Sequence, residues 1–207
     1  ALCGLGEIGQ FHLEAINASD HAELAAVCDL DQGLARSSAG ESASVHDDIP
    51  AMLAEVELDV VDICLPHHLH RPAAIEAPEA GCDVILEKPV ATDLGGRAAS
   101  AAAARAAGRH VGISYNQLHF GPHRRLAELL DEGRLGTLRS LYLRLWMGGK
   151  YGGWREDSSQ VGGGLLMDAG VHRIYTATRL GGPVRAVSAL MDNPRSAASF
   201  EISPEFE

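Results

Sequence analysis

The sequence predicts an α/β fold in which a doubly wound parallel sheet is followed by an α+β region with an open, incomplete sheet. Short apolar runs alternate with helical stretches as far as residue 115. A glycine-rich turn, Gly4 to Gly9, lies at the start of this alternation, and the regular order is lost after residue 115. Such alternation is typical of parallel sheets with covering helices. We therefore expect two domains, residues 1–115 and residues 116–207, with the second one truncated at its C-terminal end.

The first domain is expected to contain strands at residues 24–28, 44–46, 60–65, 83–86 and 111–115. Helices are expected around residues 34–35 and 52–53, and over residues 73–80 and 98–107. Pro66 and Pro89 end two of these strands, because proline has no backbone donor for a sheet ladder. Only three residues precede Gly4, which is short for a full first strand, so we expect the chain to be a piece of a longer protein.

The second domain is expected to begin with a helix over residues 122–132, which ends at Gly133. Strands are expected over residues 138–147 and 184–190, and a helix after the glycine run 162–164. A glycine-rich loop surrounds Lys150 and Tyr151, and its position suggests that it folds over a ligand.

Charge and composition exclude several classes of function. The formal net charge is −11, and a surface of this sign repels nucleic-acid phosphates, so no nucleic-acid partner is expected. No apolar run has the length of a membrane span, and no signal peptide precedes the first motif. The four cysteines lie in or beside apolar runs without metal-site spacing, so we interpret them as core residues of a cytoplasmic protein.

Gly4-Leu5-Gly6-Glu7-Ile8-Gly9 fits the G-x-G-x-x-G fingerprint of dinucleotide-binding turns. Its glycines allow a tight turn and close approach of the backbone to a pyrophosphate at a helix N-terminus. Asp29 follows Gly9 by twenty residues at the end of a strand, where a carboxylate accepts bonds from ribose hydroxyls. Asp31 lies beside it and the nearest arginine is Arg36, so NAD is favoured over NADP.

Two more segments follow strands and so lie at the carboxyl edge of the predicted sheet. The first contains Leu65, Pro66, His67 and His70; we favour a place beside the cofactor over a metal site, because no cysteine or carboxylate completes a ligand set nearby. The second is Glu87-Lys88-Pro89, which brings a cation to the edge where ligands bind.

Asp168 and His172 are four residues apart and are expected on one face of a helix, which Tyr175 and Arg179 continue. Buried charge without partners is costly. Two interpretations stay open at this point: an internal hydrogen-bond network, or a substrate site approached over the preceding glycines. Trp154 and Arg155 are candidate substrate contacts, with a structural role as the alternative.

The chain resembles the Gfo/Idh/MocA oxidoreductases, the group of glucose-fructose oxidoreductase and inositol dehydrogenase. The likeness extends from Gly4 to about Asn193 and depends on an ordered set of motifs: the glycine fingerprint, Asp29, residues 66–70, Glu87-Lys88-Pro89, Asn116, residues 133–136, Gly162-Gly163-Gly164, Asp168, Gly170 and His172.

This resemblance implies a Rossmann domain and a catalytic group of Lys88, Asp168 and His172. It implies that Lys88 or His172 accepts a hydroxyl proton while a hydride passes to nicotinamide, and that Asp168 orients a hydroxyl or the imidazole. It also implies a cis Lys88–Pro89 bond, a cofactor contact at Asn116 and homo-oligomer contacts through the second domain.

The leading hypothesis is therefore an NAD(P)-dependent dehydrogenase that acts on a sugar, polyol or cyclitol hydroxyl. One alternative is a glycoside hydrolase that uses NAD transiently and releases no net NADH. Another is a non-catalytic NAD-sensing regulator, against which the joint presence of Lys88, Asp168 and His172 argues.

Overall fold

A computed structural model describes residues 1–146 and 152–190 of the chain. The chain divides into two compact units, Ala1–Ser114 and Tyr115–Glu207.

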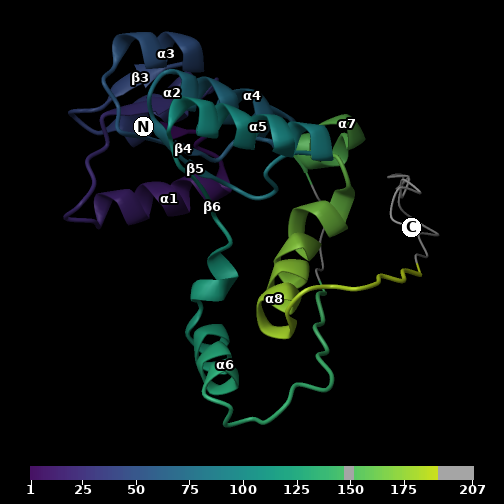
Figure 1. The fold of residues 1–207 in the computed structure, drawn as a ribbon. Coiled ribbons are helices and arrows are strands. Elements are labelled where there is room, and N and C mark those ends of the chain that lie inside the picture. Colours follow the sequence, from purple (N-terminus) through teal and green to yellow (C-terminus); the bar gives the residue numbers. More distant parts are fainter. Residues whose placement is uncertain (147–151, 191–207) are drawn as a thin grey trace. The chain divides into compact units, whose positions relative to one another are not determined.

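The first unit is built on a six-stranded, wholly parallel sheet (Figure 1). Its order is β3-β2-β1-β4-β5-β6, which is the arrangement of doubly wound dinucleotide-binding sheets. The predicted Rossmann-type α/β fold is thereby confirmed. The strands are β1 (Leu2–Cys3), β2 (Ala26–Cys28), β3 (Ser44–His46), β4 (Val60–Ile63), β5 (Asp83–Leu86) and β6 (Val111–Ile113).

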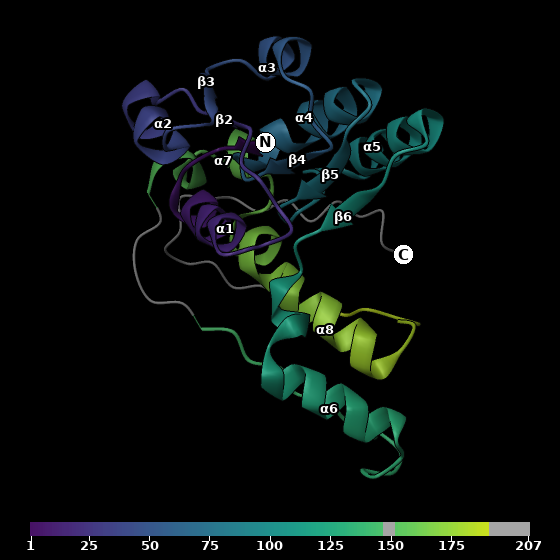
Figure 2. The same cartoon turned by 90° about the vertical axis from the view of Figure 1, so that its left-hand side faces the viewer.

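Five helices accompany the sheet: α1 (Glu7–Asn17), α2 (Gln32–Ala39), α3 (Ile49–Glu55), α4 (His67–Glu79) and α5 (Leu94–Ala107). Gly108 ends α5 in the left-handed conformation that glycine adopts without steric cost. Figures 1 and 2 show α1 on one side of the sheet and α4 with α5 on the other.

Alternating strand residues supply two separate cores, one on each face of the sheet. Leu2 and Val27 pack with Leu13 and Ala35 of α1 and α2. Cys3, Val61 and Ile63 face the opposite way and pack with residues of α3 and α4 such as Met52 and Ala74. Because side chains alternate along a strand, residues 62 and 64 belong to the α1 side of the sheet.

The described part of the second unit is helical. Its elements are η1 (Asn116–His119), α6 (Gly121–Asp131), η2 (Gly153–Glu156), α7 (Ser158–Val161), the π-helical turn η3 (Leu166–Gly170) and α8 (Val171–Gly181). The helices predicted at 122–132 and after the glycine run are confirmed as α6 and as η3 with α8.

The two strands predicted for this unit are not formed in the residues described. Residues 138–146 and 184–190 form no regular secondary structure, and Met147 with the loop around Lys150 and Tyr151 lies outside the described residues. A strand needs a hydrogen-bonded neighbour, and the described part of this unit supplies none. An apolar pattern predicts the conformation of a segment, but it does not supply that neighbour.

All four cysteines are free, as predicted, and Cys3, Cys28 and Cys82 are buried in the first unit. Among the described residues, no helix has the length and apolar character that crossing a membrane requires.

Candidate functional site

The predicted cofactor residues of the first unit gather at the carboxyl edge of its sheet. Gly4 follows β1, Asp29 follows β2, Leu65 and Pro66 follow β4, and Glu87 follows β5. The chain reverses its direction of sheet growth between β1 and β4. In doubly wound sheets, ligands bind in the crevice outside such a switch point.

The glycine fingerprint is required by backbone packing at two of its positions. Gly4 has a φ of 87°, and a Cβ there would lie 2.5 Å from the carbonyl oxygen of Cys64. A Cβ on Gly9 would lie 2.0 Å from the carbonyl oxygen of Gly4. Only glycine permits α1 to approach the strand ends this closely.

Gly6 has a different role, because a Cβ there would meet no heavy atom within 4 Å. It is exposed and begins α1 without any side chain that caps the helix. No N-cap side chain therefore competes for the amides of the first turn, which includes Glu7 and Ile8. Such amides attract an anion, and this geometry fits a dinucleotide pyrophosphate.

Pro66 likewise begins α4 without a side-chain cap, whereas the other three helices of the unit are capped by aspartate. Asp31 accepts from Gly33 and Leu34, Asp48 from Ala51, and Asp93 from Gly96. The uncapped helices are thus the two that follow β1 and β4, on either side of the switch point.

Asp29 links the glycine turn to the start of α2. Its Oδ2 accepts a hydrogen bond of 2.7 Å from the amide of Leu5, and its Oδ1 accepts one of 2.9 Å from the amide of Asp31. Each carboxylate oxygen has a second lone pair. The half-buried group is therefore oriented by the backbone and can still accept from hydroxyls.

His67 and His70 are buried at the start of α4 with their rings edge to face. The two ring nitrogens of His70 lie 2.6 Å from the carbonyl oxygen of Pro89 and 2.8 Å from that of Leu65. Burial lowers the pKa of His70. The ring therefore joins the segments after β4 and β5, and its position suits the ordering of this edge rather than metal ligation.

Glu87, Lys88 and Pro89 follow β5 directly. Glu87 and Pro89 are buried and Lys88 is half-buried. The amide of Lys88 donates to Oε2 of Glu87 at 3.1 Å, and the Lys88–Pro89 peptide bond is cis, as the resemblance implied.

Sequence reasoning missed a cluster beneath this edge, formed by His12 of α1 with Asp62 and Cys64. His12 Nδ1 lies 2.8 Å from Asp62 Oδ2, and His12 Nε2 lies 3.4 Å from Glu87 Oε1. The ligand atoms of His12, Asp62 and Cys64 lie within 4.8 Å of one another, but the 2.8 Å contact is that of a shared proton. The available signal was Asp62 itself, since a carboxylate inside an apolar strand needs a partner.

In the second unit, Asp168 is buried in the π-helical turn η3. Arg155 Nε donates to Asp168 Oδ2 at 3.0 Å, and the Arg155 guanidinium carbon lies 4.4 Å from the centre of the Trp154 ring. Three of the predicted site residues are therefore in direct contact. π-helical turns are frequent at functional sites.

The ring of Tyr115 stands edge-on to His172, with the two centres 6.3 Å apart, and is stacked on Tyr175 at 4.1 Å. Arg179 instead reaches Asp131 of α6 at 3.5 Å. The common polar face expected for Asp168, His172, Tyr175 and Arg179 stays a prediction, and the contacts made by these side chains differ.

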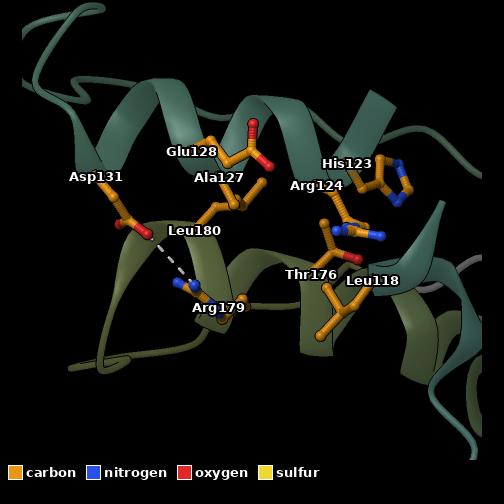
Figure 3. Close-up of a pocket in the computed structure, with 9 residues that line it drawn as sticks. All are labelled: Leu118, His123, Arg124, Ala127, Glu128, Asp131, Thr176, Arg179 and Leu180. Carbon is orange, nitrogen blue, oxygen red and sulfur yellow. Dashed lines mark hydrogen bonds and ion pairs between the residues drawn. The ribbon is translucent and has the colours of Figure 1, made fainter. Parts of the chain in front are cut away.

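Figure 3 shows a hollow between α6 and α8 that the Arg179–Asp131 pair crosses. None of the predicted site residues lines it. Its lining comprises Leu118, His123, Arg124, Ala127, Glu128, Asp131, Thr176, Arg179 and Leu180.

Comparison with known proteins identifies the family. Residues 1–115 match the oxidoreductase family described as having an NAD-binding Rossmann fold, and residues 123–204 match the Gfo/Idh/MocA C-terminal domain. The chain belongs to the Gfo/Idh/MocA oxidoreductase family. Its Rossmann unit is thus the nucleotide-binding half of a Gfo/Idh/MocA protein.

Curated members of the Gfo/Idh/MocA family include sugar dehydrogenases and reductases. The chain is 32% identical over 196 residues to a D-glucoside 3-dehydrogenase of Escherichia coli (91% of the chain, 56% of the relative). It is 35% identical over 147 residues to a dTDP-3,4-didehydro-2,6-dideoxy-alpha-D-glucose 3-reductase of Actinomadura kijaniata (70% and 44%). The chain spans about half the length of such relatives.

Among solved structures, the WlbA dehydrogenase of Chromobacterium violaceum, in complex with NADH and UDP-GlcNAcA, is similar with a TM-score of 0.83. The two sequences are 27% identical, and the match covers 97% of this chain and 60% of the other. The grouping of Lys88 with Asp168 and His172 joins two units of this Gfo/Idh/MocA chain and stays a prediction. Asn116, which is exposed in η1, likewise stays a predicted cofactor contact.

Proposed function

We propose that the protein is an NAD-dependent oxidoreductase that transfers a hydride between nicotinamide and a hydroxyl carbon of a sugar, polyol or cyclitol. One observation carries this proposal: Lys88 follows β5 at the carboxyl edge of the sheet, next to the switch point that the glycine turn borders. A cation at this edge is within the region where a dinucleotide and its substrate meet in such folds.

The residues of the first unit fit a dinucleotide. The uncapped first turn of α1 would hold the pyrophosphate over Gly6, and Asp29 would accept from the adenosine ribose hydroxyls. The cofactor residues that we propose are Gly4, Gly6, Glu7, Ile8, Gly9, Asp29, Leu65, Pro66, His67, His70, Glu87, Lys88 and Asn116.

NAD is favoured over NADP by the surroundings of Asp29. Asp31 follows two residues later and caps α2 through its carboxylate, and Leu30 between them is exposed. The Arg36 guanidinium lies 3.5 Å from the carbonyl oxygen of Gln32 on its own helix. A 2′-phosphate would therefore meet carboxylates before it met a cation.

The chain's own residues would manage the proton and the position of the substrate. Bound nicotinamide supplies the hydride acceptor or donor. Lys88 or His172 takes the hydroxyl proton, since both side chain types can act as general bases when their surroundings are suitable. Asp168, held by Arg155 at 3.0 Å, orients the hydroxyl or the imidazole, and Trp154 lies beside Arg155.

A Lys88→Met variant of the complete protein tests the proposal, because methionine keeps most of the side-chain length and removes the charge. We expect kcat to fall by roughly 10²- to 10⁴-fold, the usual contribution of a general acid or base. The dissociation constant for NAD, measured by calorimetry, should change by much less than kcat, because the pyrophosphate turn and Asp29 are retained. Arg105→Ala, at an exposed position of α5, is the control that should keep full turnover. Full turnover of Lys88→Met with normal NAD binding would overturn the assignment.

The substrate class is tested with a panel of glucosides, aldoses, polyols and cyclitols, followed through the absorbance of NADH at its characteristic band. A dehydrogenase forms NADH in step with product. Cleavage of a glycoside without net NADH would instead favour the redox-linked hydrolase, and NAD binding without any turnover would favour the sensor.

A further inference from the structure

The cluster of His12, Asp62 and Cys64 also contacts Glu87, the residue that precedes Lys88. His12 comes from the middle of α1, Asp62 from inside β4, and Glu87 from the residue after β5. The imidazole lies between the carboxylates, with Nδ1 2.8 Å from Asp62 and Nε2 3.4 Å from Glu87. This cluster is distinct from the glycine turn and from Asp29.

His12 and Asp62 come together because of the directions in which side chains point along α1 and β4. Val61 and Ile63 face the α4 side of the sheet, so Asp62 between them faces α1. Gly9 and Leu13 are the buried residues of α1, and His12 lies next to Leu13 on the flank of that buried face. The close packing that Gly9 permits therefore sets the distance from His12 to Asp62.

The charges require a cation at this position. Asp62 is 5% exposed and Glu87 is 7% exposed, and two buried carboxylates without compensation would be costly. Hydrogen bonds to Asp62, then to Cys64 and Glu87, raise the pKa of His12 to about 12. Burial raises the pKa of the Cys64 thiol to about 11, so Cys64 is neutral and His12 is the cation of the cluster at physiological pH.

Glu87 connects this cation to Lys88. Its Oε1 faces His12 and its Oε2 accepts the backbone N–H of Lys88 at 3.1 Å. We propose that His12 is a positioning residue for Lys88, because its charged ring holds the Glu87 carboxylate and thereby fixes the start of the Lys88 segment relative to α1. The inference rests on the proposed function of Lys88. It adds that one imidazolium joins the helix of the pyrophosphate turn to the strand end that carries the reacting amine.

The test compares His12→Gln with His21→Gln in the complete protein. Glutamine keeps hydrogen-bonding capacity without charge, and His21 is an exposed histidine of the same unit. We expect His12→Gln to lower kcat by roughly 10- to 100-fold through misplacement of the amine. NAD affinity should stay within about threefold of the unsubstituted protein, because the phosphate-binding amides are retained. His21→Gln should leave both unchanged.

A second readout separates positioning from general loosening and does not depend on turnover. The rate at which an acylating reagent modifies Lys88 is followed by peptide mass spectrometry at one fixed pH. Loss of the His12 charge leaves more negative surroundings, which hold the Lys88 amine in its unreactive protonated form, so modification should become slower. A merely loosened structure would instead expose Lys88 and speed its modification.

The inference is overturned if His12→Gln matches His21→Gln in kcat and in the rate at which Lys88 is modified. If His12→Gln does not fold, the test is nitrogen NMR of the unsubstituted protein with labelled histidine. A His12 ring that is neutral by pH 8 contradicts the positioning role proposed for its charge, and a ring that stays charged supports it. Full turnover of Lys88→Met would contradict the proposed role of Lys88 as proton acceptor alone, since acylation of Lys88 in His12→Gln still reports the position of the amine.

Discussion

In the glycine turn, one glycine is required for packing and another is proposed to bind the cofactor. Gly9 faces backbone and Gly6 faces open space, although both belong to one sequence fingerprint. Replacing either glycine by alanine adds the same methyl group. The consequences should therefore differ only because the surroundings differ.

We expect Gly9→Ala to lower the free energy of unfolding by about 2–3 kcal/mol, because its Cβ would lie 2.0 Å from the carbonyl oxygen of Gly4. Gly6→Ala should keep the unfolding free energy within about 0.5 kcal/mol and weaken NAD binding at least about tenfold, since its methyl group occupies the space over the helix N-terminus. Urea titrations and calorimetry check the two results. Equal stability of the two variants would refute the packing argument.

Among single site residues, those that belong to a local motif with fixed spacing could be predicted from the sequence. The fingerprint and Asp29 were predicted, and the structure places them at the sheet edge. His12 was missed because its partners are 50 and 75 positions away in sequence, and only the close packing of α1 on β4 brings them together.

At the scale of elements, helix starts in the first unit are of two kinds. Helices α2, α3 and α5 begin with aspartate caps, whereas α1 and α4 begin without one. An aspartate cap stabilises the start of a helix, and its carboxylate then accepts the hydrogen bonds that the first amides could otherwise donate to a ligand.

Asp93 caps α5 by accepting from the amide of Gly96 at 2.7 Å. We expect Asp93→Ala to lower the free energy of unfolding by about 1 kcal/mol without a change in NAD affinity, because α5 lies outside the proposed nucleotide site. Asp20→Ala, at an exposed position after α1, is the matched control. A loss of NAD affinity in Asp93→Ala would place α5 at the site and contradict this assignment.

Element prediction succeeded where the determinants are local. The run 83–86 and the alanine-rich helix that Gly108 ends were predicted closely. The runs 138–146 and 184–190 were wrongly predicted as strands, because a ladder partner is not a property of the segment itself. The π-helical turn at Asp168 also could not be predicted, since no pattern of residue types distinguishes such a turn from an α-helical one.

At the scale of the whole molecule, the buried His70 and the half-buried His12 make stability depend on pH in opposite senses. His70 has a lowered pKa, so the unfolded state binds its proton more readily, and stability falls as pH drops below about 6.5. His12 has a pKa raised to about 12. Its contribution is complete below about pH 6.5 and decreases as pH rises toward 12.

The difference in unfolding free energy between the unsubstituted protein and His12→Gln isolates the second effect. We expect this difference to be largest near pH 6 and to shrink by at most about 1.4 kcal/mol per pH unit above about pH 7. Urea titrations at about pH 6, 7.5 and 9, one below and two above the ordinary histidine pKa of about 6.5, check it. A difference that grows with pH would mean that His12 is neutral in the folded protein.

The two helices without caps have a consequence for the state of the protein without its nucleotide. The residues that begin these helices, Gly6 and Pro66, supply no side-chain acceptor for the first amides. If a pyrophosphate occupies the start of α1, the nucleotide acts as the capping group that the sequence omits. The cofactor would then complete the secondary structure of the unit that binds it, and its depletion would loosen the carboxyl edge of the sheet before the core beneath it.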